Sequence, residues 1–344
     1  MKLLVTGGMG FIGSNFIRRM YERYPTYKLV NVDALTYAGN LENLAEIESQ
    51  ERKKSDERRY RFVKGDITES AFVKQIIEQE QPNIIINFAA ESHVDRSFVD
   101  AGTFIRTNVL GMEYLLQTAR ANKVPFIQIS TDEIYGDVPS GESDEQSPLR
   151  PSNPYAASKA AADLLAQTYM RSMIASVIIV RGSNNFGPYQ YPEKLIPLAI
   201  TNLIEGKKIP VHGDGQHKRR WIHVDDFVDG VDLVLHNAIP GSIYNIAGHE
   251  VSNIELLNRL AALHKVTPKD ALEFVADRPC ADRRYAPSSS KIERELGWKP
   301  KRHIDEALAE VVQWYATHPE WWKRIKEKRE FLDHYEKQRH AKYY

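Results

Sequence analysis

A hydroxyl, two carboxylates, a phenol and an amine come close together in the middle of the chain. Thr131, Asp132 and Glu133 follow a predicted buried strand, and Tyr155 and Lys159 lie four residues apart in a helical segment. Residues four apart share one face of a helix, and an ammonium beside a phenol is expected to push the phenol toward phenolate. Such a phenol suits the removal of a proton from an alcohol while a cofactor takes the hydride. The two carboxylates add acid and base groups beyond those that an oxidation needs.

A glycine-rich turn opens the chain between a short apolar run and a helical pattern. Gly7, Gly10 and Gly13 have the spacing Gly-x-x-Gly-x-x-Gly, and Asp33 ends the second predicted strand, 20 positions after Gly13. Strand, glycine turn and helix together predict a pyrophosphate site at the helix N-terminus. A carboxylate at this distance binds adenosine ribose hydroxyls and would repel a 2′-phosphate. The pattern therefore favours NAD over NADP, against the alternative of a purely structural glycine turn.

The elements that must position these groups alternate between strand and helix. This alternation predicts an α/β fold, a doubly wound parallel Rossmann sheet with a smaller C-terminal substrate lobe. We expect residues 1–180 to form the NAD-binding domain with the catalytic residues. We expect 181–344 to form mostly the substrate-binding lobe, with some strands returning to the Rossmann sheet. The strand ends that would line the ligand edge carry Gly7, Asp33, Asp66, Ala89 and Thr131.

Composition narrows the class of protein further. The 344 residues include 46 Lys and Arg against 46 Asp and Glu, so no net field favours nucleic acid or a membrane surface. No apolar run reaches the roughly 18–20 residues that span a bilayer, and no signal peptide is predicted at the N-terminus. The single cysteine, Cys280, fits a reducing compartment. We therefore expect a cytoplasmic protein, and we predict no metal site.

With these residues in view, the chain resembles the extended short-chain dehydrogenase/reductase family. Within that family it is similar to the nucleotide-sugar 4,6-dehydratases of the dTDP-glucose 4,6-dehydratase type. The glycine turn and the Tyr155-x-x-x-Lys159 pair are shared by the whole family, sugar epimerases included. The more specific likeness lies in residues 33–44, 89–97, Thr131-Asp132-Glu133, Asn184-Asn185 and 192–197.

The resemblance implies a mechanism for the central cluster. Tyr155, assisted by Thr131 and oriented by Lys159, would take the proton of the sugar C4 hydroxyl while the C4 hydride passes to NAD. Glu133 would then remove the proton at C5, which the new ketone acidifies, and protonated Asp132 would help the C6 hydroxyl leave as water. Return of the hydride to C6 gives a 4-keto-6-deoxy sugar nucleotide with no net redox change. Adjacent carboxylates in a partly dry site tend to separate their proton affinities, which such a division of roles requires.

The resemblance also implies binding residues and a partner. The NAD site would comprise Gly7, Gly10, Phe11, Ile12, Gly13, Asp33, Thr36, Asp66, Ile67, Ala89, Ala90, Thr107, Tyr155, Lys159 and Asn185. The nucleoside-diphosphate sugar would be held by Ser92, Thr131, Asn184, Lys194, Leu195, Arg219, Asn245, Arg283 and Tyr285. Related proteins form homodimers through two helices each, which here would be residues 103–122 and 154–171.

Two departures from the family pattern leave the substrate open. Arg220 follows Arg219 where relatives tend to carry an acidic or small residue, and Pro279-Cys280-Ala281 stands in place of Pro-Gly-His. Both lie in the predicted substrate lobe. We expect dTDP-glucose, with UDP-glucose or UDP-N-acetylglucosamine as alternatives.

Other classes of protein fit the sequence less well. A UDP-sugar 4-epimerase would have no use for the Asp132-Glu133 pair. A non-enzymatic dinucleotide sensor would have little need of Tyr155 and Lys159, and a simple alcohol dehydrogenase would consume free NAD. His93 admits a catalytic reading, but the interpretation we favour is a loop residue that packs near the cofactor.

Overall fold

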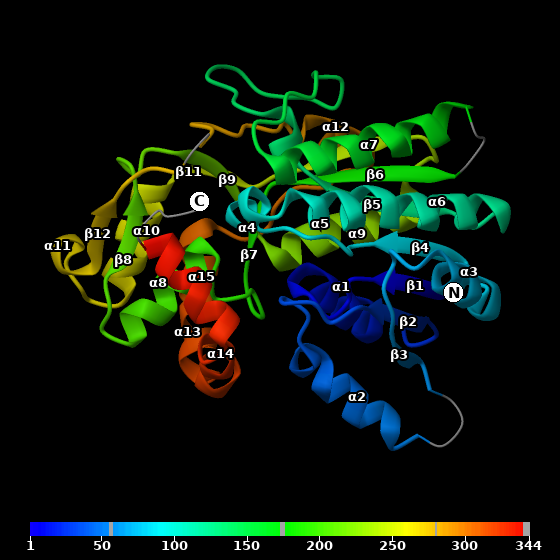
Figure 1. Ribbon diagram of the computed structural model, residues 1–344, viewed down its shortest axis with the longest axis horizontal. Helices are drawn as coiled ribbons and strands as arrows, with labels where there is room; N and C mark the ends of the chain where they lie inside the picture. The colour runs from blue at the N-terminus through cyan, green and yellow to red at the C-terminus, as the bar shows by residue number, and fades with distance from the viewer. Residues whose placement is uncertain (55–57, 173–175, 279–280, 340–344) are drawn as a thin grey trace.

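A seven-stranded parallel sheet forms the larger of two units in the computed structural model, which describes residues 1–54, 58–172, 176–278 and 281–339 (Figure 1). The strand order is β10-β6-β5-β4-β1-β2-β3. The order reverses beside β1, and this creates the switch point at which ligands of such sheets bind. The strands are β1 (Lys2–Thr6), β2 (Lys28–Asp33), β3 (Tyr60–Lys64), β4 (Ile84–Asn87), β5 (Phe126–Thr131), β6 (Val177–Gly182) and β10 (Ile243–Ile246). The predicted doubly wound parallel sheet is confirmed.

Helices cover both faces of this sheet, because alternate residues of each strand point to opposite sides. In β1, Leu3 and Val5 belong to one buried cluster, whereas Leu4 belongs to another. The first cluster includes residues of α1 (Phe11–Arg23), α9 (Val224–Asn237) and α12 (Ser290–Leu296). The second includes residues of α3 (Ser70–Glu80), α6 (Met112–Ala121) and α7 (Pro154–Ser172). Shorter segments on this unit are η1 (Leu41–Leu44), α2 (Ala45–Arg52), α4 (Val94–Val99) and η3 (Asp132–Tyr135).

The helix expected over residues 103–122 contains a change of winding. It is built from α5 (Ala101–Ile105), the π-helix η2 (Arg106–Gly111) and α6. In η2 the buried Asn108 accepts a hydrogen bond from the backbone N–H of Glu91 and donates to the Ser158 hydroxyl of α7. Single π-turns in helices often lie at functional sites, and this one ties the β4 loop to the helix that carries Tyr155.

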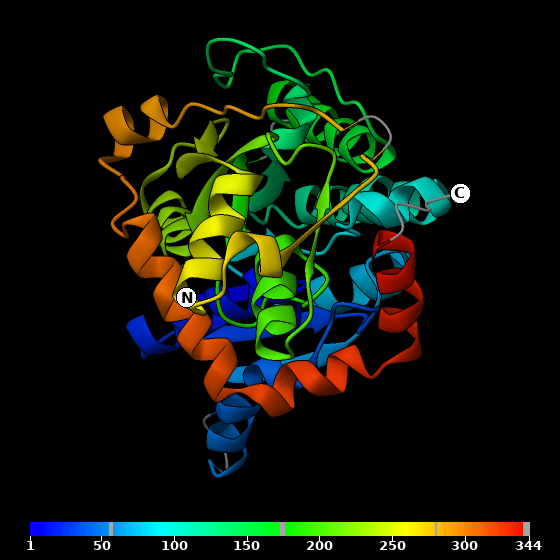
Figure 2. The ribbon, with the colours of Figure 1, turned by 90° about the vertical axis from the view of Figure 1, so that its left-hand side faces the viewer.

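The smaller unit packs around its own buried cluster. Its sheets are β7 (Asn184–Phe186), β9 (Lys218–His223) and β11 (His249–Ser252), and β8 (Ile209–His212) with β12 (Leu272–Val275). Its helices are α8 (Leu195–Ile204), α10 (Asn253–Leu263), α11 (Pro268–Ala271), α13 (Ile304–Thr317), α14 (Pro319–Lys326) and α15 (Arg329–Arg339). Figure 2 shows α13, α14 and α15 wrapping around this unit in orange and red. Segments after residue 180 contribute to both units, since β10, α9 and α12 pack in the larger one.

Two segments of the smaller unit are more deeply buried than their charge suggests. The basic stretch from His217 to Arg220 runs into strand β9, whose alternation buries Arg219 and leaves Lys218 exposed. The charged helix α15 buries Phe331 against the lobe core. In the part of the chain that the structure describes, no helix is long and apolar enough to cross a bilayer.

Candidate active site

The glycine turn between β1 and α1 is shaped for close approach of a ligand. Gly7 has φ of +71°, and a Cβ there would lie 2.5 Å from the backbone nitrogen of Ala89. A Cβ on Gly13 would lie 2.3 Å from the Gly7 carbonyl oxygen. Among the described residues no side chain caps the start of α1, whose N-cap is Gly10. The first N–H groups of the helix are therefore available to an anionic group, which the helix dipole also favours.

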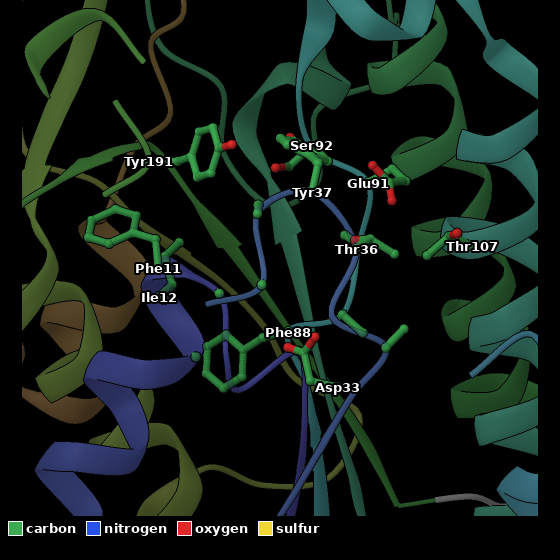
Figure 3. A pocket seen from close by; sticks show the side chains of 18 of the residues that line it. Phe11, Ile12, Asp33, Thr36, Tyr37, Phe88, Glu91, Ser92, Thr107 and Tyr191 are labelled. Atoms are coloured by element: carbon green, nitrogen blue, oxygen red, sulfur yellow. The ribbon is translucent and has the colours of Figure 1, made fainter. Parts of the chain in front are cut away.

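A cavity opens in front of this turn, and we call it the glycine-loop cavity (Figure 3). Asp33 lies at its floor, where Oδ2 accepts from the Met9 backbone N–H at 2.9 Å and Oδ1 from that of Leu35 at 2.8 Å. Burial raises the pKa of Asp33, while these two hydrogen bonds lower it. The predicted cofactor residues that line the cavity are Gly7, Gly10, Phe11, Ile12, Gly13, Asp33, Thr36, Asp66, Ile67, Ala89, Ala90, Thr107, Tyr155 and Lys159. Asn185 lines the neighbouring cavity instead.

That neighbouring cavity, the lobe cavity, lies between the carboxyl ends of the large sheet and the smaller unit. The two cavities share Ser92, Gln190, Glu193 and Lys194 in their walls. The predicted substrate residues that line the lobe cavity are Ser92, Asn184, Lys194, Leu195, Arg219 and Tyr285. The buried Oδ1 atoms of Asn184, Asn185 and Asn253 have no hydrogen-bond partner among the described residues. Buried polar atoms are normally paired, so these walls are prepared for a polar ligand.

Three predicted substrate residues lie outside both cavity walls. The Asn245 side chain is occupied by the Tyr135 hydroxyl, which donates to its Oδ1 at 2.8 Å, and by the Ser143 carbonyl. Arg283 is half-exposed and pairs with Asp214 at 2.8 Å. Thr131 lies behind the wall, where its hydroxyl contacts Asp132 at 3.4 Å.

Tyr155 and Lys159 reach the glycine-loop cavity from the first turns of α7. The Lys159 ammonium donates to the Ile129 carbonyl of β5 at 2.7 Å, and the Tyr155 phenol is hydrogen-bonded to Thr131. Burial and the nearby Glu133 carboxyl raise the pKa of Tyr155, and burial lowers that of Lys159 to about 8. The expected push toward phenolate was wrong for the protein alone, because burial and the two carboxyl groups raise the pKa of Tyr155 more than the hydrogen bond to Thr131 lowers it. The Lys159 ammonium is held by the Ile129 carbonyl.

The two carboxyl groups at the end of β5 have different surroundings. Asp132 is 2 % exposed, and burial together with the neighbouring Glu133 raises its pKa to about 8. Its Oδ2 has no hydrogen-bond partner among the described residues. Glu133 lines the lobe cavity, is hydrogen-bonded to Asn153, and has its pKa raised by burial but lowered by Arg219 and other cations. At neutral pH, Asp132 therefore carries a proton beside a carboxyl group that faces cations.

Cationic groups converge on the lobe cavity from several elements. The Arg219 guanidinium of β9 lies 4.1 Å over the Tyr285 ring and donates to the Asp282 carbonyl at 2.8 Å. The Lys194 ammonium donates to the Ser92 carbonyl at 3.1 Å. Burial lowers the pKa of both cations. Arginine and lysine in such a wall provide a binding site for a phosphate-bearing ligand.

Sequence reasoning missed several residues of this wall. Asn253 lies at the start of α10, and its orphaned amide oxygen lines the lobe cavity. Arg278 lines the same cavity, one residue before Pro279 and Cys280, which fall outside the described residues. The signal for Asn153 was present in the Asn-Pro step, because an Asn before a helix start is a typical N-cap. Its Oδ1 accepts from the Ala156 backbone N–H at 2.9 Å.

The fold and the Tyr–Lys pair at the sheet edge define a class, the NAD-binding enzymes of the short-chain dehydrogenase/reductase type. Comparison with known proteins identifies the family within this class. A model of the GDP-mannose 4,6 dehydratase family matches residues 4–311. The chain is 42 % identical over 332 residues to the dTDP-glucose 4,6-dehydratase of Streptomyces niveus, covering 95 % of this chain and 96 % of the relative. It belongs to this family of nucleotide-sugar 4,6-dehydratases.

Solved structures of dTDP-glucose 4,6-dehydratases have the same fold as this chain. A dTDP-glucose 4,6-dehydratase from Bacillus anthracis in complex with NAD superposes with a TM-score of 0.87 and 44 % identity, covering 95 % of this chain and all of that one. Another from Streptomyces venezuelae, also with NAD bound, has a TM-score of 0.89 at 44 % identity with the same coverage. A UDP-glucose 4-epimerase from Thermotoga maritima reaches 0.83 at 25 % identity over 92 % of this chain and 99 % of that one. The fold is thus shared with epimerases, but sequence similarity is far higher to the dehydratases.

Proposed function

We propose that this protein catalyses the NAD-dependent dehydration of a nucleoside-diphosphate hexose to its 4-keto-6-deoxy product, with dTDP-glucose as the substrate. The observation that carries the proposal is the pair of adjacent carboxyl groups of Asp132 and Glu133 directly after β5, of which Asp132 is buried without a hydrogen-bond partner for Oδ2 among the described residues. If the reaction stopped at oxidation of C4, the Tyr155 phenol would be the only acid–base group required. A buried acid and a neighbouring base add the means to eliminate water.

The glycine-loop cavity fits NAD. The close approach at Gly7 and Gly13 and the uncapped start of α1 suit a pyrophosphate, and Asp33 is placed to accept from ribose hydroxyls. The Bacillus anthracis and Streptomyces venezuelae dehydratases were solved with NAD bound in the same fold. When bound, NAD would supply the acceptor for the C4 hydride and, once reduced, the hydride donor for C6.

The chain's own residues would carry every proton transfer. Tyr155 would take the C4 hydroxyl proton, with Thr131 as its hydrogen-bond partner and Lys159 fixed on the Ile129 carbonyl. The buried phenol needs added positive charge to act as a base at neutral pH, and the oxidised nicotinamide ring carries such a charge. The base is therefore activated only when the oxidant is in place.

Elimination would follow at the neighbouring carboxyl groups. Glu133, which faces the cations of the lobe cavity, would remove the C5 proton, made acidic by the C4 ketone. Asp132 would deliver its proton to the departing C6 hydroxyl. A pair of titratable groups whose environments separate their protonation states is the expected arrangement for an acid and a base.

The lobe cavity would hold the nucleotide. Arg219 and Lys194 would pair with the diphosphate, and the orphaned amide oxygens of Asn184 and Asn253 would accept from sugar or base donors. Arg220 does not alter this wall: it forms an ion pair with Glu142 instead. The choice of a thymidine nucleotide rests on relatives such as the Streptomyces niveus protein, which is a dTDP-glucose 4,6-dehydratase.

We further propose a homodimer formed through the helical face of α4, α5, η2 and α7, segments that contact one another. This face carries large exposed apolar side chains on each segment: Val99, Ile105, Leu110 and Leu164. Large exposed apolar side chains gathered on neighbouring segments are typical of an association site. The proposed location is the cytoplasm, a reducing compartment that suits the single cysteine.

The test is a product analysis on the purified protein incubated separately with dTDP-glucose, UDP-glucose and UDP-N-acetylglucosamine. The proposal predicts a product one water lighter from dTDP-glucose. An unchanged mass with inverted stereochemistry at C4 would instead identify a 4-epimerase. Loss of water from a UDP-sugar alone would keep the chemistry and correct the nucleotide.

A further inference from the structure

Four buried side chains that the mechanism does not use gather beside the lobe cavity. His93 and Asp95 come from the start of α4, Glu193 from the loop before α8, and His334 from α15. Each is more than nine-tenths buried. In the described chain, His93 Nδ1, both Asp95 carboxylate oxygens, Glu193 Oε1 and His334 Nε2 have no hydrogen-bond partner. A buried polar atom without a hydrogen bond is costly. Five such atoms lie together here, and Asp95 and Glu193 have only longer ion-pair contacts through them, to Arg278 and to His93.

These atoms lie slightly farther apart than the ligand atoms around a bound metal ion. Potential ligand atoms of His93, Asp95 and His334 all lie within 4.8 Å of one another. His334 Nε2 is 4.0 Å from Glu193 Oε2. Glu193 Oε1 is 3.7 Å from His93 Nε2, the ring nitrogen opposite the unpartnered Nδ1. Bonds of about 2.0–2.2 Å to tetrahedral Zn²⁺ place ligand atoms about 3.4 Å apart. Small side-chain rotations that shift each ligand atom by about 1 Å or less would bring these atoms to coordination distance.

We propose that His93, Asp95 and His334, with Glu193 as a fourth ligand, form a binding site for a borderline transition-metal ion of the Zn²⁺ class. The imidazoles are suited to this role, because each has a buried ring nitrogen without a hydrogen-bond partner among the described residues, Nδ1 in His93 and Nε2 in His334. Imidazole nitrogens are common ligands of such metal ions.

Neighbouring cations decide which metals the site accepts. Arg96 donates to Glu193 at 3.2 Å, Arg278 lies 3.7 Å from Asp95, and the charge of Lys194 also acts on His93. The two carboxylates are thus already balanced by positive charge. Mg²⁺ and Ca²⁺ bind through carboxylate charge and oxygen ligands, so they gain little here. Zn²⁺, Co²⁺ and Ni²⁺ gain from the two imidazoles.

A metal at this place would fasten the last helix to the cavity wall. α15 lies beyond the stretch that the family model matches, which ends at residue 311. It is already held by the Arg96–Glu330 ion pair at 2.8 Å and by Gln338, which donates to the Glu193 carbonyl at 3.2 Å. Of the four proposed ligands, only His334 therefore comes from the C-terminal segment, and the other three belong to the wall of the lobe cavity.

The experiment is a Zn²⁺ titration of the chelator-treated full-length protein by calorimetry, with Co²⁺ absorption as a second readout. We compare the wild type with His334→Gln and with His303→Gln, a matched change at an exposed histidine. The wild type and His303→Gln should bind one Zn²⁺ per chain and give the intense visible absorption of tetrahedral Co²⁺. His334→Gln should bind at least about tenfold more weakly, because even second-shell changes at metal sites cost that much. A millimolar excess of Mg²⁺ should not compete.

Equal binding by His334→Gln and the wild type would overturn the proposal, as would the weak absorption of octahedral Co²⁺ in the wild type. A third readout avoids dependence on any variant. Hydrogen exchange across residues 329–339 of the wild type should slow on addition of Zn²⁺, since α15 gains a bond to the α4 segment. Exchange unaffected by bound Zn²⁺ would likewise overturn it.

Discussion

Replacement of Asp132 by Asn tests two properties of the buried acid separately: its effect on the stability of the fold and its role as a proton donor. The pKa of Asp132 is raised from an ordinary 3.8 to about 8, first by burial and then by Glu133. Between these two values the native state binds a proton that the unfolded chain has released, so stability falls as the pH rises through this window. At pH 7 the gap from the ordinary value is about 3 pH units, or at most about 4 kcal/mol at about 1.4 kcal/mol for each unit.

Asp132→Asn removes this proton linkage while keeping the shape of the side chain. The variant should therefore be more stable than the wild type, and its advantage should grow between pH 5 and pH 8. The measurement is chemical denaturation of both proteins at the two pH values. A stability difference that is the same at both would refute the raised pKa.

The same variant should lose elimination but keep oxidation. An amide has no acidic proton to deliver to the leaving hydroxyl, and loss of a general acid costs roughly 10²–10⁴-fold. Single-turnover absorbance should show reduced nicotinamide forming and persisting, while mass analysis shows no water loss. In the wild type, elimination should slow above about pH 8 as Asp132 loses its proton. Water loss at the wild-type rate in Asp132→Asn would remove Asp132 from the acid role, and Asp144→Asn, on an exposed loop, serves as the control.

Four further changes test other parts of the account. Tyr155→Phe should slow C4 oxidation by about 10²–10⁴-fold in a stopped-flow assay, because the base is gone; a normal burst would exclude that role. Glu133→Gln should accumulate reduced nicotinamide without exchange of the C5 proton into solvent, and rapid exchange would point to another base. Asp33→Ala should weaken NAD binding in a dialysis assay, since the carboxylate also holds the glycine loop through the Met9 N–H; unaltered affinity would place the ribose elsewhere. Leu164→Glu should yield monomers in analytical ultracentrifugation, because it puts a charge on the exposed apolar face, whereas an unchanged sedimentation coefficient would contradict the proposed interface.

Local spacing was enough to predict the sheet and to group the central residues. Apolar runs that end in Gly7, Asp33 or Thr131 had to be parallel strands, and parallel strands deliver their ends to one edge. Tyr155 and Lys159 share a helix face whatever the rest of the chain does. Such inferences depend only on neighbours in sequence. The structure places Gly7, Asp33, Tyr155 and Lys159 in the wall of one cavity, with Thr131 behind it.

Contacts between residues far apart in the sequence, and the desolvation of buried groups, could not be predicted from local spacing. Asn245 was expected at the substrate, but its amide is taken by Tyr135, which lies 110 positions away. The raised pKa of Tyr155 follows from burial, which no spacing reveals. His334 meets His93 across more than half the chain, with ring centroids 4.5 Å apart. A charged tail gives no sign of that contact, because only the folded lobe brings the last helix to the cavity wall.

The most direct test of the central claim follows one hydrogen through the reaction. Incubation of the purified protein with dTDP-glucose carrying deuterium at C4 should give a product one water lighter that retains the deuterium, now at C6. That result requires oxidation, elimination and hydride return within one site, with no net consumption of NAD. A product of unchanged mass, or a dehydrated product without the deuterium, would contradict the account.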